Sequence, residues 1–280
     1  MRRATAAALA GLVLLTAAAT AASAPADRAA AARGAAWLER QPIPAFGGQQ
    51  ADAIVALRVA GVPRARLRSR VRALAKAGPS YGARPGPAAK VALAANAVGA
   101  NPRRFGRIDY VARIRSGYRG GVFGTNVFDH SLAILALRRA GSRVPQRAIL
   151  TLRRARGSGG WGLEARGRGR DEVDATAIVI RAMRAAGVPR GDPALRSATA
   201  WLTRQAHRRG GFDSRGGRRP AEANSTAAAI LALAAMGRSS GAARRDLRRL
   251  QRSSGAFNWK LRIAGSRVLA TLDAVTALSR

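Results

Sequence analysis

Apolar, alanine-rich segments recur along the chain, and arginine-rich segments separate them. Six segments are apolar on nearly every face, a pattern typical of helices that lie inside a protein. A glycine follows each of the first five, at positions 61, 99, 141, 187 and 237. We therefore predict six buried helices, which span Ala51–Ala60, Ala88–Val98, Phe128–Ala140, Asp174–Ala186, Ala223–Met236 and Val268–Leu278.

The segments between them are amphipathic and basic. Their apolar residues recur at i, i+4 and i+7, which puts one helix face on the core and the other in water. Examples are Leu67, Val71 and Leu74 in one segment and Ala243, Leu247 and Leu250 in another. Buried helices that alternate with half-buried ones form a two-layer helical array.

The junctions repeat as well as the helices. The five glycines are spaced by 38, 42, 46 and 50 residues, and Ala-Gly-Val-Pro-Arg occurs at both 60–64 and 186–190. Glycine suits a left-handed helix cap, and proline suits the start of the next helix. About six helical hairpins follow, which predicts an all-α fold that closes into an α/α toroid (an α6/α6 barrel). An open solenoid is the alternative.

A second motif marks the turns that lead into the buried helices. Trp37-Leu38-x-x-Gln41 precedes Phe46-Gly47-Gly48, and Trp201-Leu202-x-x-Gln205 precedes Gly210-Gly211-Phe212. We expect the aromatic ring to fill the gap between hairpins, and Gln to hydrogen-bond free backbone groups at a helix end. Weaker copies are Gly120-Gly121-Val122-Phe123, Gly159-Gly160-Trp161-Gly162, and Leu250-Gln251 with Gly255-Ala256-Phe257.

This combination of motifs resembles the repeats of the terpene cyclase and protein prenyltransferase superfamily, also described as prenyltransferase/squalene oxidase repeats. Squalene–hopene cyclases, prenyltransferase β-subunits and cobalamin carriers share its barrel. The resemblance runs from about Ala35 to the C-terminus and implies the same toroid. The motifs are mainly structural, so the resemblance by itself does not imply an activity.

The N-terminus has the pattern of a secretory signal peptide. Arg2 and Arg3 precede an apolar run, and Ala22-Ser23-Ala24 offers a cleavage site, with Ala24-Pro25-Ala26 as a second. We expect residues 1–24 to be a signal peptide and 25–280 a single toroid domain, secreted or held in the cell envelope. An uncleaved N-terminal anchor is the alternative.

The chain is strongly basic and has no cysteine. Its 50 basic and 14 acidic residues give a net charge of +36, which cleavage after Ala24 reduces to +34. Such a charge attracts anionic lipids, polymers or phosphates, although an arginine-rich composition also explains it. Export argues against nucleic acid as the partner. Without cysteine, disulfides and thiolate chemistry are excluded.

One segment matches a catalytic motif of the family that the chain resembles. Class II terpene cyclases carry Asp-x-Asp-Asp-Thr-Ala, in which the middle Asp protonates an alkene. The match here is Glu172-Val173-Asp174-Ala175-Thr176-Ala177, which implies Asp174 as proton donor and Glu172 as its neighbour, with one carboxylate missing. Asp129 and Asn224 occupy similar places at helix starts, so a helix N-cap is the competing interpretation.

Other chemistries of the family find less support. The prenyltransferase zinc site needs Cys, and the only histidines are His130 and His207, so we expect no metal and no cofactor. His130, beside a helix start, is expected to be a hydrogen-bonded structural residue. Paired carboxylates of the glycosidase type remain open, because hairpin turns converge at the mouth of a toroid.

Three functions are compatible with these observations. The first is an exported binding protein whose central cavity takes an apolar or amphipathic small molecule or lipid, with an anionic head near arginines. The second is a cyclase with Asp174 as acid. The third is an envelope scaffold that binds an anionic polymer or a membrane surface through its arginines. We expect the cavity rim to carry Trp37, Asp129, His130, Trp161, Trp201, Phe212, Asn224, Phe257 and Trp259.

Overall fold

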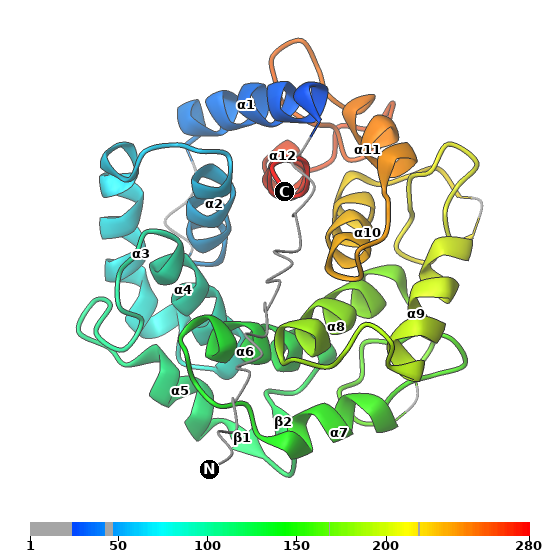
Figure 1. The fold of residues 1–280 in the computed structure, drawn as a ribbon. Coiled ribbons are helices and arrows are strands. Elements are labelled where there is room, and N and C mark those ends of the chain that lie inside the picture. Colours follow the sequence, from blue (N-terminus) through cyan, green and yellow to red (C-terminus); the bar gives the residue numbers. More distant parts are fainter. Residues whose placement is uncertain (1–23, 43–46, 168, 218) are drawn as a thin grey trace, which may run out of the picture.

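The computed structural model describes residues 24–42, 47–167, 169–217 and 219–280, in which twelve α-helices form two concentric layers (Figure 1). The inner helices are α2 (Gly47–Val59), α4 (Pro85–Ala97), α6 (Val127–Arg139), α8 (Val173–Ala185), α10 (Ala223–Ala235) and α12 (Arg267–Leu278). The outer helices are α1 (Pro25–Arg40), α3 (Arg68–Tyr81), α5 (Tyr110–Ser116), α7 (Gln146–Arg154), α9 (Pro193–Arg204) and α11 (Gly241–Arg248). Each predicted apolar segment coincides with an inner helix, so the predicted hairpin repeat is confirmed.

Two minor elements complete the list. A 3₁₀ turn, Arg64–Leu67, precedes α3. The antiparallel strands β1 (Tyr118–Arg119) and β2 (Val122–Phe123) connect α5 to α6. Within the described residues, no helix has the length and apolar character needed to cross a bilayer. The predicted signal peptide lies outside the described residues except for Ala24, so its export function stays a prediction.

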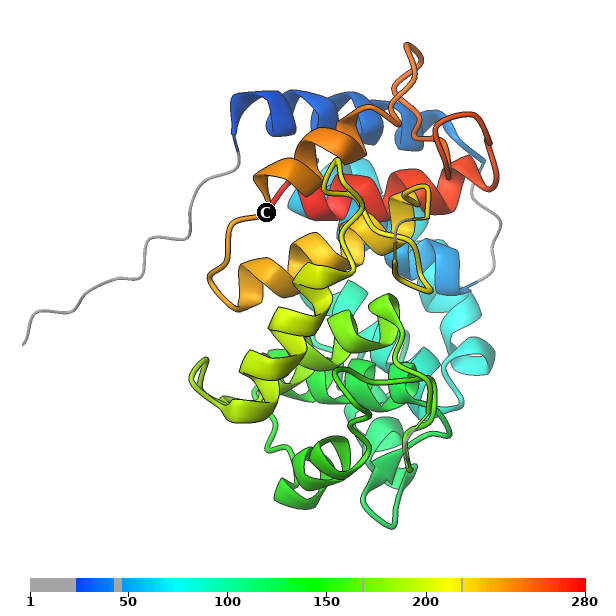
Figure 2. The same cartoon turned by 90° about the vertical axis from the view of Figure 1, so that its right-hand side faces the viewer.

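The helices form a closed ring. Every inner helix contacts the next one, and α12 contacts α2. The first outer helix, α1, packs across α12 and covers the joint between the two ends of the repeat (Figure 2). Closure of the ring confirms the predicted toroid and rules out the open solenoid.

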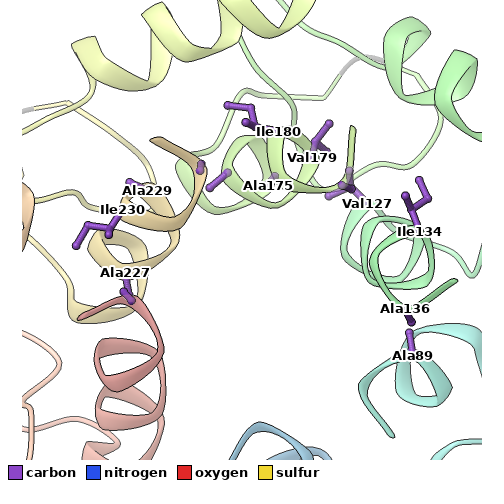
Figure 3. Packing of buried hydrophobic residues seen from close by; sticks show 14 of the residues in the cluster. Ala89, Val127, Ile134, Ala136, Ala175, Val179, Ile180, Ala227, Ala229 and Ile230 are labelled. Carbon is purple, nitrogen blue, oxygen red and sulfur yellow. The ribbon is translucent and has the colours of Figure 1, made fainter. Parts of the chain in front are cut away.

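Small and branched side chains have different roles in the packing of the inner helices. Ala89 of α4 and Ala136 of α6 point at one another, so alanine allows neighbouring inner helices to approach closely (Figure 3). Ile134, Ile180 and Ile230 point away from the central space and are fully buried (Figure 3). The predicted stripes of the outer helices face this layer, because Leu67, Leu74 and Leu247 are buried. The hydrophobic core is therefore the shell between the two rings of helices.

The predicted junctions serve as caps and plugs. The five glycines that end inner helices all have positive φ, between 65° and 94°, which glycine adopts without strain. Trp161, Phe212 and Phe257 are buried plugs, and the Trp161 indole Nε1 donates to the Leu152 carbonyl at 2.6 Å. Gln41 and Gln205 donate to backbone carbonyls one turn earlier, as expected.

A side chain in the second turn of four inner helices holds the Gly-Gly-aromatic turn in place. In each case it accepts a hydrogen bond from the backbone N–H of the aromatic residue, at 2.9–3.0 Å. The acceptors are His130 for Phe123, Thr176 for Trp161, Thr226 for Phe212 and Thr271 for Phe257. His130 Nε2 then donates to the Ala148 carbonyl at 3.0 Å, and burial lowers the pKa of its imidazole. The prediction of a structural role for His130 is confirmed.

Inner helices are parallel and are joined at their C-terminal ends. An arginine of one helix donates from Nε to a carbonyl in the last turn of the next helix or directly after it, at 3.1–3.3 Å. The three bonds run from Arg58 to Ala97, from Arg138 to Ala185 and from Arg184 to Ala235. These carbonyls carry the negative end of the helix dipole, which suits a cation. One end of the ring is thus rich in arginine for a structural reason.

Candidate functional site

A cavity of about 2240 Å³ occupies the centre of the ring and is partly open to solvent. Binding pockets for small molecules typically measure about 300–1,000 Å³, so this space is large enough for a long or branched ligand. All six inner helices contribute to its wall. Because these helices are parallel, their N-terminal turns form one end of the cavity and their C-terminal turns the other.

The middle of the wall is apolar. Along an inner helix, the residues that line the cavity recur about one turn apart, as the 3.6-residue helical period requires. The same repeat positions line the cavity on successive inner helices. We call this wall the apolar belt; its members are Val55, Leu93, Leu132, Leu135, Ile178 and Leu231. All six are half-buried. They contact an open space rather than another layer of side chains, which is how a site for an apolar chain differs from a filled core.

Polar side chains gather toward the N-terminal end of the inner helices. Lys90 Nζ binds Asp52 Oδ2 at 2.7 Å, and Asn224 Nδ2 donates to Asp273 Oδ2 at 2.6 Å. These four residues, the inner polar cluster, come from α2, α4, α10 and α12 and all line the cavity. Asp52, Lys90 and Asp273 occupy the same position in their repeats. On α12 this position lies two residues after Thr271.

Burial controls the charge of this cluster. Asp273 faces the open cavity, but the surrounding helices desolvate it and raise the pKa of its carboxyl to about 6. The hydrogen bond from Asn224 opposes this rise, and the negative charge of Asp52 adds to it. For Lys90, burial acts to lower the pKa, but Asp52 outweighs it and the ammonium pKa is raised. The lumen therefore holds a carboxyl that titrates near pH 6.

Asp174 lies next to this cluster on α8, as the second residue of the helix. Burial raises the pKa of its carboxyl to about 6, helped by Asp273, Glu222 and Glu172, while a hydrogen bond with Ser225 lowers it. Its Oδ1 is buried without a hydrogen-bond partner among the described residues. The Ser225 hydroxyl also donates to Glu222 at 3.2 Å, so it lies between two carboxyl groups.

The N-cap interpretation of Asp129, Asp174 and Asn224 is wrong. The N-cap residue of α6 is Asn126, which accepts from the Asp129 N–H, and those of α8 and α10 are Glu172 and Glu222. Counted from the capping glycines, the three residues do not share one repeat position either. Asp174 and Asn224 both lie thirteen residues before theirs, but Asp129 lies twelve before its own, so Phe128 takes the equivalent place.

The structure places the predicted catalytic pair, Glu172 and Asp174, together at the start of α8. Glu172 starts α8 at the N-cap position, where its backbone N–H donates to the Trp161 carbonyl and its side chain makes no capping bond. Asp174 is close enough to feel its charge. Neither residue is among the described side chains that line the cavity.

The predicted cavity rim is also placed differently. Among those nine residues, only Asn224 belongs to the described lining of the cavity. His130, Trp161, Phe212 and Phe257 are buried in the shell between the layers. Trp37, Trp201 and Trp259 are half-buried outside the cavity, and Asp129 packs against Gly86 and Gly124. The Gly-Gly-aromatic turns connect outer helices to inner helices. Their aromatic rings therefore pack in the shell between the two layers of helices and not in the lumen.

The other end of the cavity is dominated by cations. The described lining contains eleven arginines and Lys90 against three acids, which are Asp27, Asp52 and Asp273. Asp27 pairs with Arg244 at 3.3 Å and also with Arg248. The sequence pattern predicts basic outer faces but not this concentration of positive charge inside the ring, because the concentration arises only when the C-terminal turns of parallel helices converge.

Sequence comparison gives no match. No family model fits the chain, and no curated protein matches it. Solved structures do match. The type II terpene cyclase MstE from Scytonema superposes with a TM-score of 0.69 at 14% identity, over 91% of this chain and 97% of that one. This chain has a terpene cyclase-like α/α-toroid fold.

Two further structures agree with this fold. The ent-copalyl diphosphate synthase from Streptomyces platensis has a TM-score of 0.59 at 17% identity, over 83% of this chain and 50% of that one. A protein from Actinoplanes has a TM-score of 0.57 at 16% identity, over 90% and 98%. Structures of MstE are known with its substrate, geranylgeranyl dihydroxybenzoate, and with its product, merosterolic acid A. At these identities, the terpene cyclase-like toroid is the shared property.

Proposed function

We propose that this protein binds an apolar or amphipathic small molecule or lipid in the lumen of its toroid, without converting it. The observation that carries the proposal is the apolar belt, which lines a cavity of about 2240 Å³ between two polar ends. Burial of apolar surface provides the free energy, about 25 cal/mol per Å² removed from water. The prenylated ligands of MstE, a toroid of the same fold, support a hydrophobic ligand.

The polarity of the lumen orients such a ligand. Its apolar chain lies along the belt, and an anionic head lies at the arginine-rich end. Binding rather than turnover is proposed because Asp174, the residue that matches the catalytic motif, is not among the described side chains that line the cavity. A ligand in the cavity contacts the apolar belt and not the Asp174 carboxyl.

The test is binding of a neutral apolar fluorophore, N-phenyl-1-naphthylamine, to the purified protein. We expect saturable binding that weakens at least tenfold in the double variant Leu135→Gln and Leu231→Gln, because both side chains belong to the belt. Leu150→Gln is the matched control, since Leu150 is an exposed leucine of α7. The proposal is overturned if the protein does not bind the probe, or if the belt variant and the control bind equally.

A second candidate function is protonation of an alkene by Asp174, as in class II terpene cyclases. A specific observation favours it: burial raises the pKa of Asp174 to about 6, and its Oδ1 has no hydrogen-bond partner in the described part of the chain, so a protonated acid is available at mildly acidic pH. Linear isoprenoids incubated with the wild type and with Asp174→Asn test it. Cyclic products that form only with the wild type support an enzyme, and no product or equal products rule it out.

A further inference from the structure

Most arginines around the cavity have a structural partner. Arg58, Arg138, Arg184 and Arg190 donate to helix-end carbonyls, and Arg244 and Arg248 bind Asp27. Their charge is therefore matched by groups of the protein itself. Five other lining arginines differ, because their guanidinium groups make no hydrogen bond or ion pair with the described residues: Arg139, Arg181, Arg238, Arg245 and Arg280. Arg238 lies in the loop between α10 and α11, and Arg245 lies on the outer helix α11. The other three, Arg139, Arg181 and Arg280, lie on inner helices or directly after one.

These three side chains come from separate parts of the wall. Arg139 is the last residue of α6, and Arg280 follows α12 at the equivalent repeat position. In the order of inner-helix contacts, α6 and α12 stand opposite one another across the ring (Figure 1). Arg181 lies on α8, roughly 6 Å deeper along the helix axis, given a rise of 1.5 Å per residue. They approach the lumen from three directions.

Arg280 is close enough to the other two arginines to interact with the charge of each. Desolvation and, second to it, the charge of Arg280 lower the pKa of Arg181 to about 10, while Asp273 opposes both effects. Desolvation and the charge of Arg139 likewise lower the pKa of Arg280. Arg181 and Arg280 still carry a positive charge at neutral pH. Like charges held together with no ion-pair partner among the described residues form a site that an oxyanion stabilises, because each guanidinium offers several donors to its oxygens.

We propose that Arg139, Arg181 and Arg280 form a phosphate subsite inside the lumen, which takes the phosphorylated head of the ligand whose chain lies along the apolar belt. This proposal rests on the proposed function. Arg181 determines how deep in the lumen the phosphorylated head of the ligand binds. It lies between the arginine-rich end and Ile178 of the apolar belt, one turn earlier on α8. The shared chemistry is a phosphate monoester, whether it is part of a lipid or free in solution.

The experiment is calorimetric titration at pH 8, where a phosphate monoester is close to a dianion. The probes are 1-oleoyl lysophosphatidate, 1-oleoylglycerol and inorganic phosphate, with both amphiphiles kept monomeric. The two amphiphiles carry the same acyl chain and differ in the phosphate. We expect the wild type to prefer lysophosphatidate at least tenfold, and Arg181→Gln to reduce this preference to about threefold or less without weakening 1-oleoylglycerol.

Arg204→Gln is the matched control, because Arg204 is an exposed arginine of the outer helix α9 and its loss changes the net charge equally. An Arg139→Gln and Arg280→Gln double variant is expected to behave as Arg181→Gln does. Equal effects of Arg181→Gln and Arg204→Gln would overturn the subsite, since the preference would then come from net charge alone.

The probes separate this proposal from the one on which it rests. If both amphiphiles bind equally, the phosphate subsite is wrong and the lipid-binding function stands. If inorganic phosphate binds, loses binding in Arg181→Gln, and neither amphiphile binds, the subsite stands for free phosphate and the lipid-binding function is wrong. If no probe binds, both are wrong.

Discussion

The buried carboxyl of Asp174 makes stability depend on pH. Its pKa is about 6 in the folded protein, against an ordinary value of 3.8, so folding favours its protonated form. Its contribution is fully present below pH 3.8 and is lost as the pH rises through about 6. We expect Asp174→Asn to be more stable than the wild type at pH 7.5, by up to about 3 kcal/mol, and to differ little from it at pH 4.

Urea unfolding at both pH values measures this difference. Asp246→Asn, on the outer helix α11, removes the same charge away from the lumen and serves as the control. A destabilised Asp174→Asn at pH 7.5 would show that the carboxylate is required in its charged form, contrary to the sign expected from its burial.

The hydroxyl of Thr226 should matter more than its shape. It accepts from the Phe212 N–H at 2.9 Å and is completely buried. Thr226→Val keeps the volume but leaves that N–H without a partner, which costs about 1–3 kcal/mol. Thr226→Ser keeps the acceptor, so it is expected to cost less in urea unfolding. Equal losses in the two variants would mean that packing, not the hydrogen bond, holds the turn.

For single residues, the sequence predicts the roles of the helix-ending glycines and of the turn residues, but neither the helix N-caps nor the lumen. The glycines, Gln41 and His130 act as their patterns indicate, because these roles are local. Asp273 and Arg181 were missed, since they sit on helices that are apolar on most faces and match no motif. The one available signal was the repeat position: Asp273 lies two residues after Thr271, and Asp52 and Lys90 occupy the same position in their repeats.

Among the elements, α1 depends on a single glycine for its contact with α12. A Cβ on Gly34 would lie 2.6 Å from the Val275 Cγ2 and 3.3 Å from the Phe257 ring. Helix propensity favours Gly34→Ala by about 1 kcal/mol, but overpacking of a core typically costs about 1–3 kcal/mol. Because α1 and α12 cannot separate without loosening the ring, we expect net destabilisation.

Thermal unfolding of Gly34→Ala, compared with Gly241→Ala as a control, measures whether overpacking outweighs helix propensity. Gly241 begins α11 and has no close neighbour at its Cβ position, so its substitution should be neutral or stabilising. Adding Val275→Ala to Gly34→Ala should recover part of the loss. Without this recovery, the contact between α1 and α12 is not the cause.

The inner and outer helices were predictable because each has a distinct pattern. The inner helices are apolar all round, since one face meets the core, two meet neighbouring helices and the fourth lines a lumen with an apolar belt. The same pattern hides the lumen, because a leucine in the belt and a leucine in the core look alike in sequence. The α/α toroid and the places of its inner helices were thus predictable, while the wall of the candidate site was not.

For the whole molecule, closure of the ring joins segments more than two hundred residues apart. Asp27, in the first turn of α1, binds Arg244 and Arg248 of α11, and Gln251 donates to the Ala30 carbonyl at 2.8 Å. Only 3% of the Asp27 side chain is exposed. No sequence pattern links residues so distant, and this contact depends on the helices having turned through a full circle.

Asp27 should therefore contribute more to stability than an acid of an ordinary surface pair. Asp27→Asn leaves two arginines without their counter-ion at a largely buried place, a change that typically costs about 3–5 kcal/mol. Arg244 and Arg248 also face the cavity, where water reaches them, so we expect the lower part of that range. Glu39→Gln breaks the Glu39–Arg66 pair, in which the Arg66 side chain is 62% exposed, and should cost less than about 1 kcal/mol.

Urea unfolding of both variants at low and high salt measures the difference, which should persist at high salt because the Asp27 pair is shielded from ions. Equal, salt-sensitive losses would show that apolar packing of α1 on α12 closes the toroid without help from these charges.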